Sequence, residues 1–174
     1  SILTNIKAAN PDVIFAPSSI ATAPLIIKQA RELGINAKIM AGDTWENSSI
    51  IENAGKSAEG IVLSTFFDDA DPATAEAASF IKGFKTYLVA NKQDEIIPAV
   101  SALGYDAYIT ALKAIEKANS TKGPAIRDAL AGVSVEGVTG KITFDSNGDA
   151  DKEMAFIKTV KDGQFKFLKT VSVL

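Results

Sequence analysis

The stretch that decides the fold covers residues 11–43 and reads PDVIFAPSSIATAPLIIKQARELGINAKIMAGD. It opens with a short apolar run, Val13–Phe15, which is typical of a strand buried on both faces of a parallel sheet. Residues 20–34 then repeat apolar side chains at helical spacing and end on a glycine, which predicts a helix. A second short strand follows over 37–41. Strand, helix and strand in this order predict a right-handed βαβ unit, and therefore an α/β fold with a parallel sheet and flanking helices.

The alternation of strands and helices stops near residue 67. Before that point we expect a short helix over 46–54 and a third buried strand over 60–67. Beyond it the sequence predicts helices with no strand between them, over 73–91, 99–118 and 122–131. An apolar stripe on the first of these helices, Phe80, Phe84 and Leu88, cannot stay in water without cost. We expect it to pack on another chain or on a repositioned part of this one, or to cause self-association.

The end of the chain has the pattern of strands again. Residues 141–145 predict a strand, and residues 154–174 predict a β-hairpin because Asp162-Gly163 separates two segments of alternating polarity. We expect this hairpin to return to the sheet that contains Val13–Phe15.

Composition narrows the possible functions. The chain has 174 residues, a net charge of −3, no cysteine and no histidine. This charge balance offers no basic face for phosphate backbones, so we expect no nucleic acid partner. Without histidine, cysteine or a phosphate-binding glycine loop we expect neither an enzyme nor a cofactor or metal site. No apolar run is long enough for a membrane span. Because the chain starts at Ser1 without methionine or a signal peptide, we expect it to lie inside a longer protein.

One segment partly matches a calcium-binding loop. Asp145, Asn147 and Asp149 alternate as calcium ligands do, but the loop requires glycine at its sixth position and glutamate at its twelfth. Ala150 and Phe156 occupy those positions. The segment is therefore expected to be a solvated turn rich in Asx residues.

The candidate ligand-binding residues follow two of the predicted strands. Ser18 and Ser19 come after the first strand, and Asp43, Thr44 and Trp45 come after the second. Ligands of open α/β sheets bind at the carboxyl ends of the strands. Asp43 could pair with an ammonium group there while Trp45 offers apolar area or a cation–π face. A second interpretation is helix capping, by a serine before a helix starting at Ile20 and by Asp43 or Thr44 before one near Glu46.

Six segments occur in an order that resembles a known family. They read NPDVIFAPSS, QARELGINAKIMAGDTW, AGKSAEGIVLST, GYDAYITALKAIEKA, VEGVTGKITFDSNGD and AFIKTVKDGQF. In this order they are similar to the C-terminal half of the periplasmic leucine/isoleucine/valine-binding proteins, the type I solute-binding proteins of amino-acid ABC transporters. The resemblance covers essentially the whole chain.

The resemblance implies a fragment of a two-lobe protein. Residues 1–67 and 152–174 would form the C-terminal lobe, and 68–151 would be a helical portion of the N-terminal lobe, whose remainder is missing. The family closes on an amino acid held between its lobes and delivers it to a membrane permease. This implies a periplasmic or extracellular location, with a lipid anchor possible in the full-length protein.

The same resemblance assigns a role to Asp43, which matches the acidic residue that binds the ligand's α-ammonium group. Near Ser19 the family has an aromatic contact where this sequence has a hydroxyl, so the ligand preference is left open. A receptor's sensor domain and a binder of amides or urea share the fold and are alternatives. A flavodoxin-like enzyme or receiver domain would need a second acid near Asp43, and none is placed there.

Overall fold

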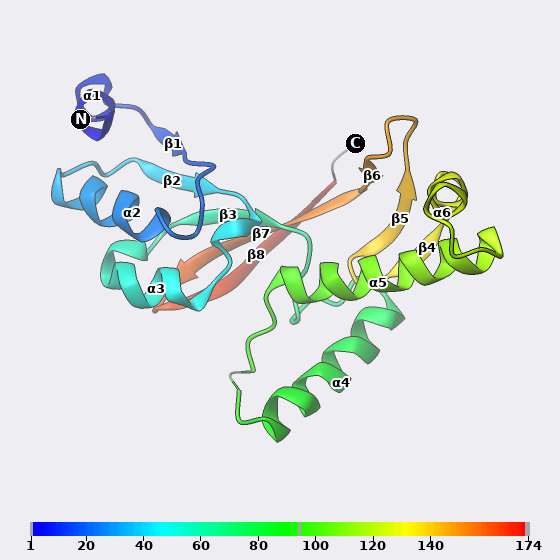
Figure 1. Ribbon diagram of the computed structural model, residues 1–174. Helices are drawn as coiled ribbons and strands as arrows, with labels where there is room; N and C mark the ends of the chain where they lie inside the picture. Colours follow the sequence, from blue (N-terminus) through cyan, green and yellow to red (C-terminus); the bar gives the residue numbers. More distant parts are fainter. Residues whose placement is uncertain (1, 94, 173–174) are drawn as a thin grey trace. The chain divides into compact units, whose positions relative to one another are not determined.

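The computed structural model of the protein describes residues 2–93 and 95–172. These residues form two compact units. In Figure 1 the colours follow the sequence and do not mark the units. Unit 1 consists of the described residues up to Thr65 together with Phe156–Thr170, and unit 2 holds the described residues of Phe66–Ala155 together with residues 171–172. The chain therefore passes from unit 1 into unit 2 and returns.

Unit 1 is built on a five-stranded sheet with the order β1-β2-β3-β7-β8. The strands are β1 (Val13–Phe15), β2 (Lys38–Ala41), β3 (Val62–Thr65), β7 (Met154–Lys161) and β8 (Gln164–Ser172). The first three are parallel to one another, and β3 pairs with β7 in antiparallel register. The predicted parallel strands are confirmed, but the complete sheet is mixed because the chain returns as a hairpin.

The turn of the C-terminal hairpin is held to the rest of unit 1 by hydrogen bonds. Asp162 and Gly163 both have a positive φ, 54° and 70°, as the predicted two-residue turn requires. Both backbone N–H groups donate to the carboxylate of Glu59, at 3.1 and 2.7 Å. The expectation that the C-terminal hairpin shares a unit with Val13–Phe15 is confirmed.

The helices of unit 1 bury one face of its sheet. These helices are α1 (Ile2–Ala9), α2 (Ala23–Glu32) and α3 (Ser48–Ala54), and Figure 1 shows α2 and α3 beside the strands. Ile14 and Ile39 point into the core with residues of α2 and α3. Their alternating neighbours Val13, Phe15 and Met40 are 46%, 66% and 36% exposed. The expectation that the first strand is buried on both faces is therefore wrong, because the described helices leave this face open.

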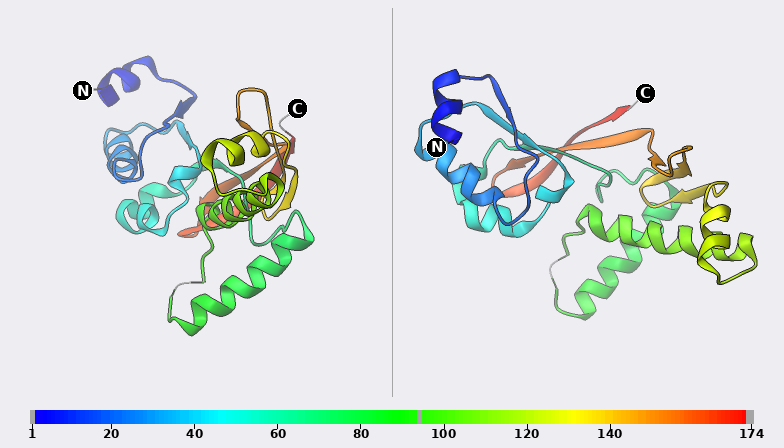
Figure 2. Two further views of the ribbon diagram at one scale, coloured as in Figure 1. Left: turned by 45° about the vertical axis from the view of Figure 1, so that its right-hand side comes forward. Right: turned by 45° about the horizontal axis from the view of Figure 1, so that its top comes forward.

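Unit 2 combines helices with a small antiparallel sheet. Its elements are α4 (Ala75–Ala90), α5 (Ala99–Ala118), α6 (Gly123–Leu130), β4 (Val135–Gly137), β5 (Gly140–Phe144) and β6 (Ala150–Asp151). Strand order is β4-β5-β6, and Figure 2 shows α5 lying beside α6. Ala114 of α5 packs with Val135 and Ile142. The sequence pattern predicted only β5, since β4 and β6 are too short to show an alternation.

The aromatic stripe of α4 packs within unit 2. Phe80 meets the edge of Phe67 with ring centroids 6.1 Å apart, and Tyr105 of α5 lies 5.1 Å from Phe80. Leu88 is buried. Phe80 and Phe84 are half-buried, so the stripe packs in part against residues of its own unit. Phe67 itself was predicted to be the last residue of a strand, but β3 ends at Thr65 and Phe67 joins this cluster.

A buried carboxylate joins α5 to the β4–β5 turn. Asp106 is 3% exposed and accepts hydrogen bonds from the backbone N–H groups of Val138 and Thr139, at 2.6 and 2.8 Å, and from the Thr139 hydroxyl at 2.6 Å. Gly137 passes so close that an added Cβ would lie 2.6 Å from the Asp106 Oδ1 atom. Because each donor is buried, the turn depends on this one acceptor.

We expect Asp106→Ala to lower the free energy of unfolding by about 2 to 4 kcal/mol, because it leaves two buried N–H groups without an acceptor. Urea unfolding followed by far-UV circular dichroism measures the loss. Asp106→Asn keeps one acceptor oxygen and serves as the matched control, with a smaller loss. A loss well below about 1 kcal/mol in Asp106→Ala would show that the carboxylate does not hold the turn.

The open face of β1 and β2 predicts binding of apolar dyes. Replacing Val13 and Phe15 together by threonine keeps the strand propensity but removes apolar area, so anilinonaphthalene sulfonate fluorescence should fall. Leu25→Thr on α2, where the side chain is 57% exposed, is the control. An equal fall in both variants would contradict a patch formed by the sheet face.

Candidate functional site

The candidate site lies where β2 ends. Gly42 follows β2, and residues Asp43–Trp45 form one 3₁₀ turn, η1. The turn is closed by Trp45 N–H donating to the Gly42 carbonyl at 3.2 Å and by Glu46 N–H donating to the Asp43 carbonyl at 2.9 Å. The Asp43 residue is partly exposed at this edge of unit 1. Its place beyond a parallel strand is the position in which α/β sheets bind ligands.

Asp43 and Thr44 do not cap the next helix. The N-cap of α3 is Asn47, whose side-chain oxygen accepts from Ser49 N–H at 2.9 Å. The capping interpretation of Asp43 and Thr44 is therefore wrong. It failed because η1 separates β2 from α3, and a 3₁₀ turn of three residues has no apolar periodicity to reveal it.

The two serines also do not cap a helix through their side chains. Helix α2 begins at Ala23 rather than Ile20, and Thr22 is its N-cap residue without a side-chain cap bond. The exposed Ser19 hydroxyl lies 3.3 Å from the Thr22 hydroxyl. The Ser18 hydroxyl oxygen is buried and has no hydrogen-bond partner within residues 2–93 and 95–172. Buried hydroxyl groups are normally paired, so Ser18 is an exception that needs an explanation.

The Ser18 carbonyl joins the loop after β1 to the turn after β2. It accepts a hydrogen bond from the Trp45 indole Nε1–H at 2.9 Å and a longer one from the Thr44 hydroxyl at 3.4 Å. The structure thus brings Ser18, Thr44 and Trp45 together at one edge of the sheet. Asp43 belongs to the same turn.

The Trp45 ring itself is part of the core. Its residue is 1% exposed, and it packs in the cluster that contains Ile14, Ile39 and Ile50. The ring is therefore buried within unit 1, whereas its position after a strand predicts that it offers apolar area to a ligand. A large side chain four residues after an apolar strand fits a core position as well as a binding site, and the sequence does not separate the two.

Three further polar residues of this edge were not predicted. The carboxylate of Glu46 forms a buried ion pair with Lys158 of β7 and accepts a hydrogen bond from the Thr65 hydroxyl at 2.7 Å. The signal was present in β7, where Lys158 occupies an inward position between Phe156 and Val160. A lysine at such a position predicts an acidic partner, because a buried charge without one is too costly.

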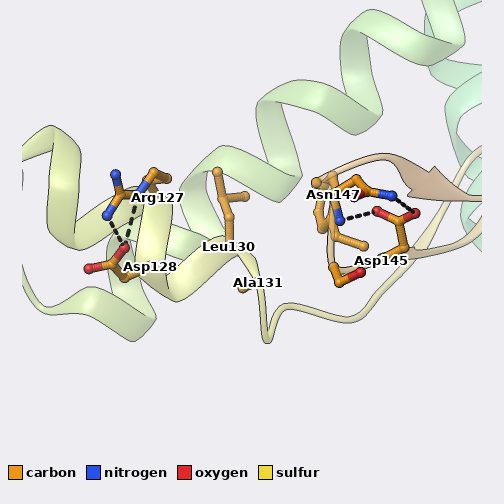
Figure 3. A pocket seen from close by; sticks show the side chains of 9 residues that line it. Arg127, Asp128, Leu130, Ala131, Asp145 and Asn147 are labelled. Atoms are coloured by element: carbon orange, nitrogen blue, oxygen red, sulfur yellow. Dashed lines mark hydrogen bonds and ion pairs between the residues drawn. The ribbon is translucent and has the colours of Figure 1, made fainter.

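A separate hollow of about 380 Å³ lies in unit 2 between α6 and the β5–β6 turn (Figure 3). Asp145 accepts from the backbone N–H groups of Asn147 and Asp149, at 2.8 and 2.9 Å, which confirms the predicted Asx turn. These backbone donors, first that of Asp149 and then that of Asn147, lower the pKa of Asp145. Arg127 pairs with its neighbour Asp128. Arg127 and Asp128 are thus engaged with each other, and Asp145 is engaged with backbone donors of its own turn.

The described part of the chain contains no group of three or more acidic, histidine or cysteine side chains that could hold a metal ion. Within the same residues, no helix combines the length and the apolar character that crossing a membrane requires.

Comparison with known proteins points to one family. A family model described as periplasmic binding protein matches residues 1–164. The leucine-, isoleucine-, valine-, threonine- and alanine-binding protein of Pseudomonas aeruginosa is 28% identical over 155 residues, which are 86% of this chain and 38% of that protein. The chain thus spans less than half the length of that relative.

Solved structures agree with this similarity. A leucine-binding protein, LivK, from Thermotoga maritima is 31% identical with a TM-score of 0.88, over 99% of this chain and 48% of that one. LivJ from Streptococcus pneumoniae, a branched-chain amino acid transporter substrate-binding protein in complex with isoleucine, is 26% identical with a TM-score of 0.80, over 98% and 47%. The predicted fold class, that of the type I periplasmic binding proteins, is confirmed. The chain belongs to the periplasmic binding protein family.

Proposed function

We propose that this chain is part of an extracytoplasmic solute-binding protein that captures a small amino acid, of the branched-chain class, and delivers it to the permease of an ABC transporter. The relatives named above bind such amino acids, and that similarity supports the ligand class. In this proposal unit 1 is the C-terminal lobe and unit 2 contributes to the N-terminal lobe. The rest of that lobe belongs to the longer protein, which is periplasmic or extracellular and can carry a lipid anchor.

The observation that carries the proposal is the joining of two strand-end loops at the Ser18 carbonyl. Because the Trp45 indole N–H binds this carbonyl at 2.9 Å, the loop after β1 and the turn after β2 are held at one edge. A ligand bound at this edge meets a carboxylate from one loop and hydroxyl groups from the other.

Each group has a chemical task in this proposal. Asp43 pairs with the α-ammonium group of the amino acid, since a carboxylate is the natural partner of a charged N–H donor. The buried Ser18 hydroxyl, which has no partner among the described residues, contributes a hydrogen bond at the same edge. Ser19 and Thr44 border it with exposed hydroxyl groups. Trp45 acts from the core by holding the Ser18 carbonyl in place.

We expect Asp43→Asn to weaken amino acid binding by about 2 to 5 kcal/mol, because it removes the charge that pairs with the ammonium group and keeps the size. Calorimetric titration of leucine, isoleucine and valine into the complete two-lobe protein measures the loss. Asp12→Asn, which makes the same change of charge before β1, is the control and should bind as the wild type does. Unchanged affinity in Asp43→Asn would remove Asp43 from the site.

Ser18→Ala should not destabilise the fold. Because the buried hydroxyl has no partner in the described chain, its removal is expected to raise the free energy of unfolding by about 1 kcal/mol. The loss of a ligand hydrogen bond should weaken binding about ten-fold. Thermal unfolding and titration test the two effects, with Ser19→Ala as the matched control. A clear loss of stability specific to Ser18→Ala would mean that the hydroxyl serves the fold.

A further inference from the structure

We propose that the buried ion pair between Glu46 and Lys158 is a positioning element that fixes the turn presenting Asp43. The inference rests on the proposed function of Asp43 and concerns residues that do not themselves touch the ligand.

The pair is deeply buried and joins distant parts of the chain. The side chains of Lys158 and Glu46 are 5% and 4% exposed, and 112 residues separate the two along the sequence. Glu46 Oε1 pairs with the Lys158 ammonium, and Oε2 accepts from the Thr65 hydroxyl at 2.7 Å. Both carboxylate oxygens are thereby directed to β7 and β3, which are neighbours in the sheet (Figure 1).

The carboxylate is connected to Asp43 through one short turn. The backbone N–H of Glu46 donates to the carbonyl of Asp43 at 2.9 Å, so the two residues are the ends of a single hydrogen-bonded turn. Between them Trp45 is fixed in the core and bound to the Ser18 carbonyl. If Glu46 lost its partners, the turn would lose its polar attachment to β3 and β7 and keep only the contacts of Trp45.

Stability alone is a poor reason for such a pair. Removing two charges from water costs several kcal/mol per ion, and apolar residues of similar volume often stabilise a fold equally well or better. An ion pair in which each carboxylate oxygen has its own partner restricts the conformation of the backbone that carries the carboxylate. A carboxylate that binds an ammonium group needs its position held by such supporting contacts.

The chain contains a spectroscopic reporter for this geometry. Trp45 is the single tryptophan of the sequence and lies within the turn. Its emission and its quenching by acrylamide report how well the turn excludes water. We therefore compare the 174-residue wild type with Lys158→Met, which removes the charge but keeps an extended side chain, and with Glu46→Gln, which keeps size and an acceptor for Thr65. Thr139→Val in unit 2 is the control, because it removes a buried hydrogen bond far along the chain from Trp45.

In the folded variants Lys158→Met and Glu46→Gln we expect red-shifted Trp45 emission and a quenching constant raised about two-fold or more, since local opening exposes the indole. Thr139→Val should lower stability without either change. Wild-type emission and quenching in a folded Lys158→Met would overturn the proposal. Should Lys158→Met not fold, Glu46→Gln decides by the same criterion, and Thr65→Val, which leaves the ion pair intact, should give an intermediate quenching constant.

A second measurement separates this inference from the proposed function. In the complete two-lobe protein, Lys158→Met should weaken leucine binding about ten-fold at equal fold content, or about 1.4 kcal/mol. If the wild type binds no amino acid, the proposed function fails while the fluorescence result still decides whether the pair positions the turn. If the wild type binds and Lys158→Met binds equally well, the positioning role is wrong.

Discussion

The hydrogen bond from the Trp45 indole to the Ser18 carbonyl is the constraint on which the edge of unit 1 depends. Parallel strands end side by side, but the loops that follow them are independent unless something joins them. Here a core side chain does so, because the ring is buried with Ile14 and Ile39 while its N–H reaches the loop after β1. The same residue therefore serves packing and loop geometry, and the arrangement of Asp43 follows from it.

The elements with long apolar or periodic patterns were predictable from the sequence. The strands at Val13–Phe15 and Lys38–Ala41, the helix α5 and the Asp162-Gly163 turn each follow from spacing or turn chemistry. What could not be predicted depends on contacts made elsewhere. Whether a parallel strand is covered on both faces depends on which helices reach it, and β4 is a strand chiefly because β5 pairs with it.

The residues of the candidate site also divide into those that local sequence predicts and those that depend on distant contacts. Position after a strand was sufficient to select Asp43, Ser18 and Thr44, which the structure places at one edge. The burial of Trp45 and the acidic partner of Lys158 depend on contacts with residues far along the chain, and the alternation within β7 indicates a strand without identifying those contacts. A charged residue at an inward position of a strand indicates a buried partner of opposite charge elsewhere in the chain.

The buried carboxylates of Asp106 and Glu46 replace their lost water with different kinds of partner. Asp106 is satisfied by the backbone N–H groups of Val138 and Thr139 and by the Thr139 hydroxyl, all within unit 2. Glu46 instead depends on a cation that the chain supplies only when β7 has joined the sheet next to β3. Without residues 156–170 in unit 1, the carboxylate of Glu46 lacks the Lys158 ammonium group that compensates the cost of its burial. The final geometry of the turn that carries Asp43 is therefore coupled to the return of the C-terminal hairpin, so the candidate site is completed by the last strands of the chain and not by the βαβ unit that contains it.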